Sequence, residues 1–226
     1  MAALHRRRIL DVATRLFDER GFGNVSTEEI IQEVGYARRT LYSYFSSKEL
    51  IQLSIVLEGF HSLRQQIENA YTLEISFTEA CQKLLQLVSE EQTSHPYRTS
   101  SMLQYSAPSI PPGLSDIARN DLVATIEEIN ITGRQLDDLS ERLAEQGARE
   151  GRLRPGINAR MAGTVLWSII VTLVTLGINK APYFEAEYNL STEDFLNQAW
   201  ELVIYGIALP DETKTSTTPT QPRSKK

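Results

Sequence analysis

Three observations predict an all-α protein. One is helical spacing between residues 4 and 20, where the apolar residues that share one face are Ile9, Val12, Ala13, Leu16 and Phe17. Another is a pair of capping boxes, at 26–29 and 76–79, in which a serine and a glutamate satisfy each other's backbone N–H groups at a helix start. The last is that neither β-type alternation nor a repeat with a period of about 20 to 50 residues occurs.

Two short helices follow the first one. The capping box at Ser26 starts a helix, and Gly35 ends it because glycine adopts the left-handed conformation without a Cβ clash. Leu41 and Phe45, four residues apart, indicate another short helix directly afterwards. Two helices joined by a tight glycine turn are typical of a helix-turn-helix, whose second helix enters the DNA major groove.

The rest of the chain predicts helices as well. Ser46 or Ser47 caps a helix to about Ala70, and further helices are expected from 76 and over 97–105, 115–149, 158–178 and 191–209. The expected buried face of the 115–149 helix is Ile117, Val123, Ile126, Ile129, Leu136, Leu139 and Leu143. We therefore expect a helix-turn-helix domain over 1–48, a helical effector-binding and dimerisation domain over 49–210, and a disordered tail over 211–226.

The net charge of −6 is unevenly distributed. Residues 1–50 hold eight Lys and Arg against seven Asp and Glu, whereas residues 51–210 hold eleven against twenty, and the tail after 210 holds four against two. The N-terminal part is thus the one expected folded region in which local charge does not oppose attraction to phosphates.

Several classes of site are not expected. Cys81 is a single cysteine, and His5, His61 and His95 are far apart in sequence, so neither a disulfide nor a metal site is predicted, and no cofactor is implied. No signal peptide is apparent, and the apolar window from Val165 to Ile178 is shorter than the roughly 20 residues of a membrane span. We expect a cytoplasmic protein without a membrane partner.

Side chains suited to DNA contact gather on and around the second helix of the predicted helix-turn-helix, the one that contains Leu41. Arginine can bridge the O6 and N7 atoms of guanine, hydroxyl groups can contact base edges, and helix N-termini, tyrosines and lysines can hold phosphates. The Arg6–Arg8 run is expected to form a flexible basic arm near the DNA. The candidate DNA-binding residues are Ser26, Thr27, Tyr36, Ala37, Arg38, Arg39, Thr40, Tyr42, Ser43, Tyr44 and Lys48.

The run from Ser26 to Leu50 resembles the signature of the tetracycline-repressor (TetR) family. The matching positions are Gly35, Leu41, Tyr42, Tyr44, Phe45 and Lys48, and the resemblance covers about residues 5–55. It implies a sequence-specific transcriptional regulator that acts as a repressor and leaves its operator when a small-molecule effector binds. The chain departs from the family pattern at Ile31, Val34, Tyr36 and Ala37, and Ala37 cannot form the side-chain cap that a serine would provide, a loss of about 1 kcal/mol.

The last two long helices are apolar nearly all round, so each needs cover on two sides. A second copy of the chain is the expected cover, giving a homodimer that binds a palindromic duplex; a monomeric core helix is the alternative. The expected interface residues are Leu166, Ile170, Val174, Trp200 and Ile204.

An effector pocket is expected among the central helices, for a small and partly apolar molecule. Its candidate lining residues are Phe60, His61, Met102, Tyr105 and Trp167, although aromatic residues at helical spacing are also ordinary core residues.

Two other functions remain open from the sequence alone. One is a helical ligand-binding or scaffold protein without DNA function. The other is an all-α enzyme, which we do not expect because no nucleophile motif, phosphate loop or acid–base pair of carboxylates occurs.

Overall fold

The computed structural model describes residues 2–71, 75–153 and 156–207. Its elements are α1 (Ala2–Arg20), the 3₁₀ turn η1 (Phe22–Asn24), α2 (Thr27–Val34), α3 (Arg38–Tyr44), α4 (Lys48–Tyr71), α5 (Phe77–Ser94), α6 (Pro96–Leu103), α7 (Asp116–Arg149), α8 (Ala159–Asn179), α9 (Ala181–Tyr188) and α10 (Thr192–Ile207). The described residues contain no β-strand. The predicted all-α fold class, with an N-terminal helix-turn-helix and a helical C-terminal part, is confirmed.

Local signals fix the ends of α2. Ser26 and Glu29 form the predicted capping box: the Glu29 N–H donates to the Ser26 hydroxyl at 3.2 Å, and the Ser26 N–H donates to the Glu29 carboxylate at 2.8 Å. Gly35 ends the helix at a φ of 75°, in the left-handed region. The turn to α3 is therefore set by residues next to it in sequence.

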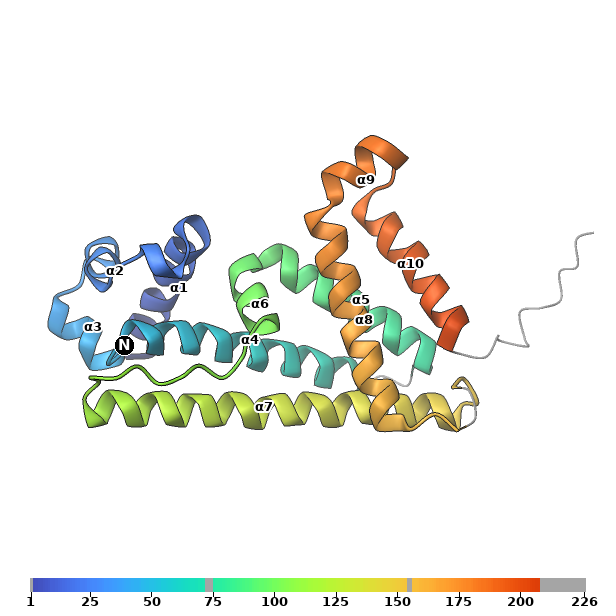
Figure 1. Ribbon diagram of the computed structural model, residues 1–226, viewed down its shortest axis with the longest axis horizontal. Helices are drawn as coiled ribbons and strands as arrows, with labels where there is room; N and C mark the ends of the chain where they lie inside the picture. Colours follow the sequence, from blue (N-terminus) through green and yellow to red (C-terminus); the bar gives the residue numbers. More distant parts are fainter. Residues whose placement is uncertain (1, 72–74, 154–155, 208–226) are drawn as a thin grey trace, which may run out of the picture.

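Two long helices join the two ends of the molecule. Figure 1 shows α4 and α7 running side by side, with α1, α2 and α3 gathered at one end and α8, α9 and α10 at the other. At the first end the Ser46 hydroxyl donates to the Asp121 carboxylate at 2.7 Å, which ties the chain after α3 to α7. The helix-turn-helix is thus held against both long helices.

The buried side chains form two hydrophobic clusters. The first runs from Ile9 in α1 to Val56 in α4 and takes Leu122 and Ile129 from α7. The second collects residues of α4, α5, α7, α8 and α10. The core of the N-terminal part therefore extends into α4, beyond residue 48, and the domain boundary at 48 stays a prediction.

Two expectations about elements are wrong. No helix was expected over 181–188, where α9 forms. On α7, Ile117 and Val123 are 72% and 46% exposed, whereas Ala118 and Leu122 are buried in their place. Pro210 and the expected tail lie outside the described residues.

Helix α8 meets the length and composition of a membrane span, with a mean hydropathy of 2.0 in its most apolar window. Core helices of soluble proteins meet the same test, and Leu166, Ile170 and Val174 of α8 pack into the second cluster. Only 28% of that window is buried within the chain, so much of the surface of α8 is not packed against the rest of the chain.

Candidate nucleic-acid interface

Helix α3 is anchored by its apolar side and exposes its polar side. Leu41 and Phe45 are fully buried in the first cluster. Arg38, Arg39 and Ser43 are exposed on the opposite side, and Thr40 is half-buried. The helix also lies at one end of the molecule, where a duplex can approach it (Figure 1).

Ala37 occupies the N-cap position of α3 and makes no side-chain cap hydrogen bond. Its backbone carbonyl accepts from the Thr40 N–H at 2.9 Å. The first turn of α3 therefore keeps free backbone N–H groups that a serine at this position would partly satisfy.

Arg38 is paired within the chain in the absence of DNA. Its guanidinium lies 2.9 Å from the Glu28 carboxylate and 5.5 Å from the centre of the Tyr42 ring. The Tyr42 hydroxyl is in turn 3.2 Å from the Thr27 hydroxyl, so the first turn of α2 and the exposed side of α3 form one polar network. Arg39, by contrast, has no ion-pair partner among the described residues.

The pKa of Glu28 lies below its ordinary value. The first cause is a hydrogen bond from its own backbone N–H, followed by the Thr27 hydroxyl, with Arg38 adding attraction. The carboxylate is therefore held in its charged form beside the arginine.

The N-terminus of α2 offers less to a phosphate than expected. The Ser26 N–H is donated to Glu29, and Arg20 binds the same carboxylate at 2.5 Å. These hydrogen bonds, the one from the Ser26 backbone first, lower the pKa of Glu29 to about 2. Of the two residues predicted there, Thr27 keeps its place near α3, whereas the Ser26 amide is already used.

Tyr36 and Tyr44 are half-buried and share a neighbour that the sequence did not reveal. The Nδ1 atom of His5 lies 2.6 Å from the Tyr36 hydroxyl, and its ring centre lies 6.3 Å from that of Tyr44. Because His5 stands 31 residues before Tyr36, no local pattern could connect them. His5 thus positions two tyrosines at the edge of α3.

Lys48 is engaged inside the domain. Its ammonium group donates to the backbone carbonyls of Phe22 and Val25 at 3.0 and 2.9 Å and lies 4.2 Å from the centre of the Phe22 ring. Two of its three protons are therefore committed to the turn before α2. Lys48 therefore braces that turn, and its expected phosphate contact stays a prediction.

The expected basic arm is part of helix α1. Arg7 lies 2.9 Å from Asp11 and 3.5 Å from Glu58, while Arg6 and Arg8 lie over the rings of Phe45 and Tyr36. The helix continues because Ala2 to Leu4 favour it and the arginine stems pack on neighbours.

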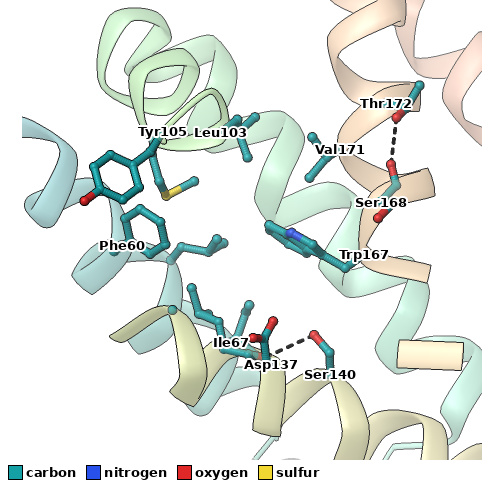
Figure 2. A pocket seen from close by; sticks show the side chains of 14 residues that line it. Phe60, Ile67, Leu103, Tyr105, Asp137, Ser140, Trp167, Ser168, Val171 and Thr172 are labelled. Atoms are coloured by element: carbon teal, nitrogen blue, oxygen red, sulfur yellow. Dashed lines mark hydrogen bonds between the residues drawn. The ribbon is translucent and has the colours of Figure 1, made fainter. Parts of the chain in front are cut away.

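A cavity of about 430 Å³ lies between α4, α6, α7 and α8, within the size range of small-molecule sites. Four of the five residues expected in an effector pocket line it: Phe60, Met102, Tyr105 and Trp167. Figure 2 shows these side chains around one space, with Asp137 below it. His61 does not line it; its side chain is 43% exposed and faces Glu128 at 3.4 Å.

Four of the five residues expected at the dimer interface lie in the interior of the chain. Leu166, Ile170, Val174 and Trp200 are all buried in the second cluster, so they cannot meet a partner copy. Since both helices are apolar nearly all round, the sequence could not distinguish their inner face from their outer one. The side chain of Ile204 lies outside the described residues.

The geometry of α2 and α3, with a buried anchor and an exposed polar side, defines a helix-turn-helix DNA-binding domain. Residues 9–53 match the sequence profile of the family described as bacterial regulatory proteins, tetR family. An HTH-type transcriptional regulator of Bacillus subtilis, YdgC, is 33% identical over 69 residues, which are 30% of this chain and 35% of that protein. The helix-turn-helix domain of this chain belongs to the tetR family.

Solved structures resemble the chain over nearly its whole length. A tetR-family regulatory protein from Rhodococcus RHA1 has a TM-score of 0.69 at 19% identity, covering 92% of this chain and 98% of that one. AibR, solved in complex with isovaleryl coenzyme A and operator DNA, has a TM-score of 0.64 at 16% identity, covering 88% and 97%. At such identities the likeness extends to the fold, while the match to the curated relative spans about a third of its length.

Proposed function

We propose that this protein is a cytoplasmic transcriptional regulator that binds a palindromic operator as a homodimer and leaves it when a small molecule enters the cavity. The observation that carries the proposal is the exposed polar side of α3, held by the buried Leu41 and Phe45. Arg38, Arg39 and Ser43 are the side chains proposed to contact base edges, with Tyr42 and Thr27 at phosphates. A dimer places two such helices about 34 to 36 Å apart, one turn of the duplex.

The position of the cavity supports the proposal that a small molecule controls DNA binding, because one of its helices also contacts the N-terminal part. Helix α6 contributes Met102 to the cavity, and at its other end Tyr97 contacts Phe17 of α1, with ring centres 5.8 Å apart. The Tyr97 hydroxyl also donates to Gln52 of α4 at 2.5 Å. A ligand that fits only one arrangement of these helices would shift the population away from the DNA-binding one.

The test is a mobility-shift titration with duplex DNA from upstream of the gene, at several salt concentrations. We expect Arg38→Ala and Arg39→Ala each to lower affinity by about 1 to 3 kcal/mol, or roughly five- to 150-fold. Arg160→Ala is the matched control, because Arg160 is an exposed arginine near the start of α8, at the opposite end of the molecule from α3.

Two results would contradict the proposal. Unchanged affinity and salt dependence in both α3 variants would remove these arginines from the interface. Failure of the wild-type protein to bind any upstream duplex at low ionic strength would refute gene control itself.

A further inference from the structure

Three serine and threonine hydroxyl groups line the cavity, and each donates its proton to a backbone carbonyl. Ser140 donates to the Leu136 carbonyl at 3.1 Å, Ser168 to the Thr164 carbonyl at 2.8 Å, and Thr172 to the Ser168 carbonyl at 2.7 Å. A hydroxyl has one proton to donate and two lone pairs. Toward the cavity, these side chains therefore present acceptors.

Asp137 adds a fourth acceptor group, and it is charged. Among the described residues that line the cavity it is the one carboxylate, and no described residue forms an ion pair or a hydrogen bond with it. In Figure 2 its oxygens face the space between Phe60 and Trp167. Asp137 is an exposed residue, so the negative charge lies where the cavity opens to solvent, without an ion-pair partner among the described residues.

The remaining wall is apolar and aromatic. Phe60, Tyr105 and Trp167 supply ring faces, and none of the lining residues that the structure describes is a lysine, arginine or histidine. The uncharged donors are the Trp167 indole N–H and the Tyr105 hydroxyl, which lies on the side of its ring away from Trp167 (Figure 2). A carboxylate or phosphate in this space would be repelled by Asp137 with no cation among the described lining residues to offset it, although solvent at this exposed carboxylate weakens the repulsion.

We propose that the cavity selects an organic cation: a protonated amine on a bulky apolar or aromatic body. The ammonium group donates to Asp137 and to the hydroxyl oxygen of Ser140, which lie together in Figure 2, while the aromatic rings cover the body and attract the charge. The proposal rests on the cavity being the effector site of the proposed function. It also implies that this chain rejects acyl thioesters of coenzyme A, whose phosphates are anionic.

The test uses three probes with one skeleton and different charges: 3,3-diphenylpropylamine, 3,3-diphenylpropan-1-ol and 3,3-diphenylpropanoic acid. Titration calorimetry with the full chain, without DNA, measures the three affinities at neutral pH. We expect the amine to bind about tenfold more tightly than the alcohol, and the acid to bind at least about tenfold more weakly than the alcohol.

Asp137→Asn keeps the shape of the side chain and removes its charge. We expect it to abolish the preference for the amine over the alcohol without changing alcohol binding. Asp138→Asn is the matched control, because Asp138 is the next residue, is exposed and does not line the cavity, and it should keep the preference.

Three outcomes would overturn the proposed ligand class: acid binding at least as tight as amine binding, an amine preference that survives in Asp137→Asn, or no amine binding at millimolar concentration. Because these titrations contain no DNA, their result does not depend on whether the protein binds DNA in the mobility-shift assay. A protein that binds the amine and ignores every duplex refutes gene control alone, whereas one that binds its duplex and prefers the acid refutes only the ligand class.

Discussion

Lys48 lies where the family motif has a lysine, and in this chain its ammonium group faces two carbonyl oxygens of the segment before α2. The sequence placed it correctly next to the helix-turn-helix but could not show which way the side chain turns. Phosphate and carbonyl oxygens attract an ammonium group by the same chemistry, and only the folded backbone places carbonyls within 3 Å.

We expect Lys48→Met to lower the free energy of unfolding by about 2 kcal/mol, because two charge-assisted hydrogen bonds are lost while the apolar stem is kept. Urea denaturation measures this change. Lys83→Met serves as the control, since Lys83 is exposed on α5, and it should have almost no effect.

A phosphate contact would give the opposite pattern. In Lys48→Met the slope of the logarithm of DNA affinity against the logarithm of salt concentration would then become shallower by about one. The free energy of unfolding would stay unchanged. That result would return Lys48 to the interface.

Glycine determines how closely α7 and α8 approach. A Cβ atom on Gly163 would lie 2.5 Å from the Ser140 carbonyl oxygen, and backbone atoms of a packed helix cannot move aside alone. On Gly133, by contrast, a Cβ atom would lie 3.7 Å from the Phe60 ring, an ordinary contact.

We expect Gly163→Ala to destabilise the protein by about 1 to 3 kcal/mol, because α7 and α8 must separate. Gly133→Ala, also within a helix, should be neutral or stabilise by up to about 1 kcal/mol through helix propensity. Thermal unfolding of the two variants compares them, and equal melting temperatures would contradict the close packing.

Elements with local signals could be predicted from sequence. The capping boxes at Ser26 and Ser76 and the glycine stop at Gly35 each involve residues within a few positions, and all three form as expected. Helix α9 also has local signals, Pro182 in its first turn and Asn189 after its end at a φ of 50°, and the prediction missed them. Its side chains pack on one another and on α10, as the stacked rings of Phe184 and Phe195 show.

The buried face of α7 was only partly predictable. Along a helix of 34 residues the side that faces the neighbouring helices rotates gradually around the helix axis. A list of its large apolar residues therefore includes some that face solvent. Ala118, Leu122 and Thr132 are buried, while the larger Ile117 faces solvent. Leu122 packs with residues of α4 in the first cluster. Which side chains surround the cavity also depends on how four helices meet, and Asp137 was not foreseen for that reason.

At the scale of the whole molecule, the far end of the fold keeps a large apolar outer surface. Val165 and Leu176 of α8 are each 41% exposed, and Leu202 of α10 is 75% exposed. Exposed apolar surface of this kind marks an interaction site, and a second copy related by twofold symmetry would cover it.

We expect Leu202→Glu to weaken self-association at least about tenfold, because a twofold interface buries the new charge twice. Sedimentation equilibrium measures the dissociation constant. Ile117→Glu is the control, being 72% exposed on α7, away from α8 and α10. Equal association in wild-type and Leu202→Glu would place the interface elsewhere.

In the proposed complex, the ion pair between Arg38 and Glu28 would have to be replaced before Arg38 could contact DNA. A phosphate that contacts Arg38 replaces the Glu28 carboxylate, which has the same charge. A duplex of arbitrary sequence therefore gains little binding free energy from this arginine. A guanine edge offers two acceptors in the plane of the guanidinium, a geometry that outcompetes a single exposed carboxylate. If Arg38 contacts a base as proposed, Glu28 would act as an internal competitor and widen the difference in affinity between the operator and other DNA.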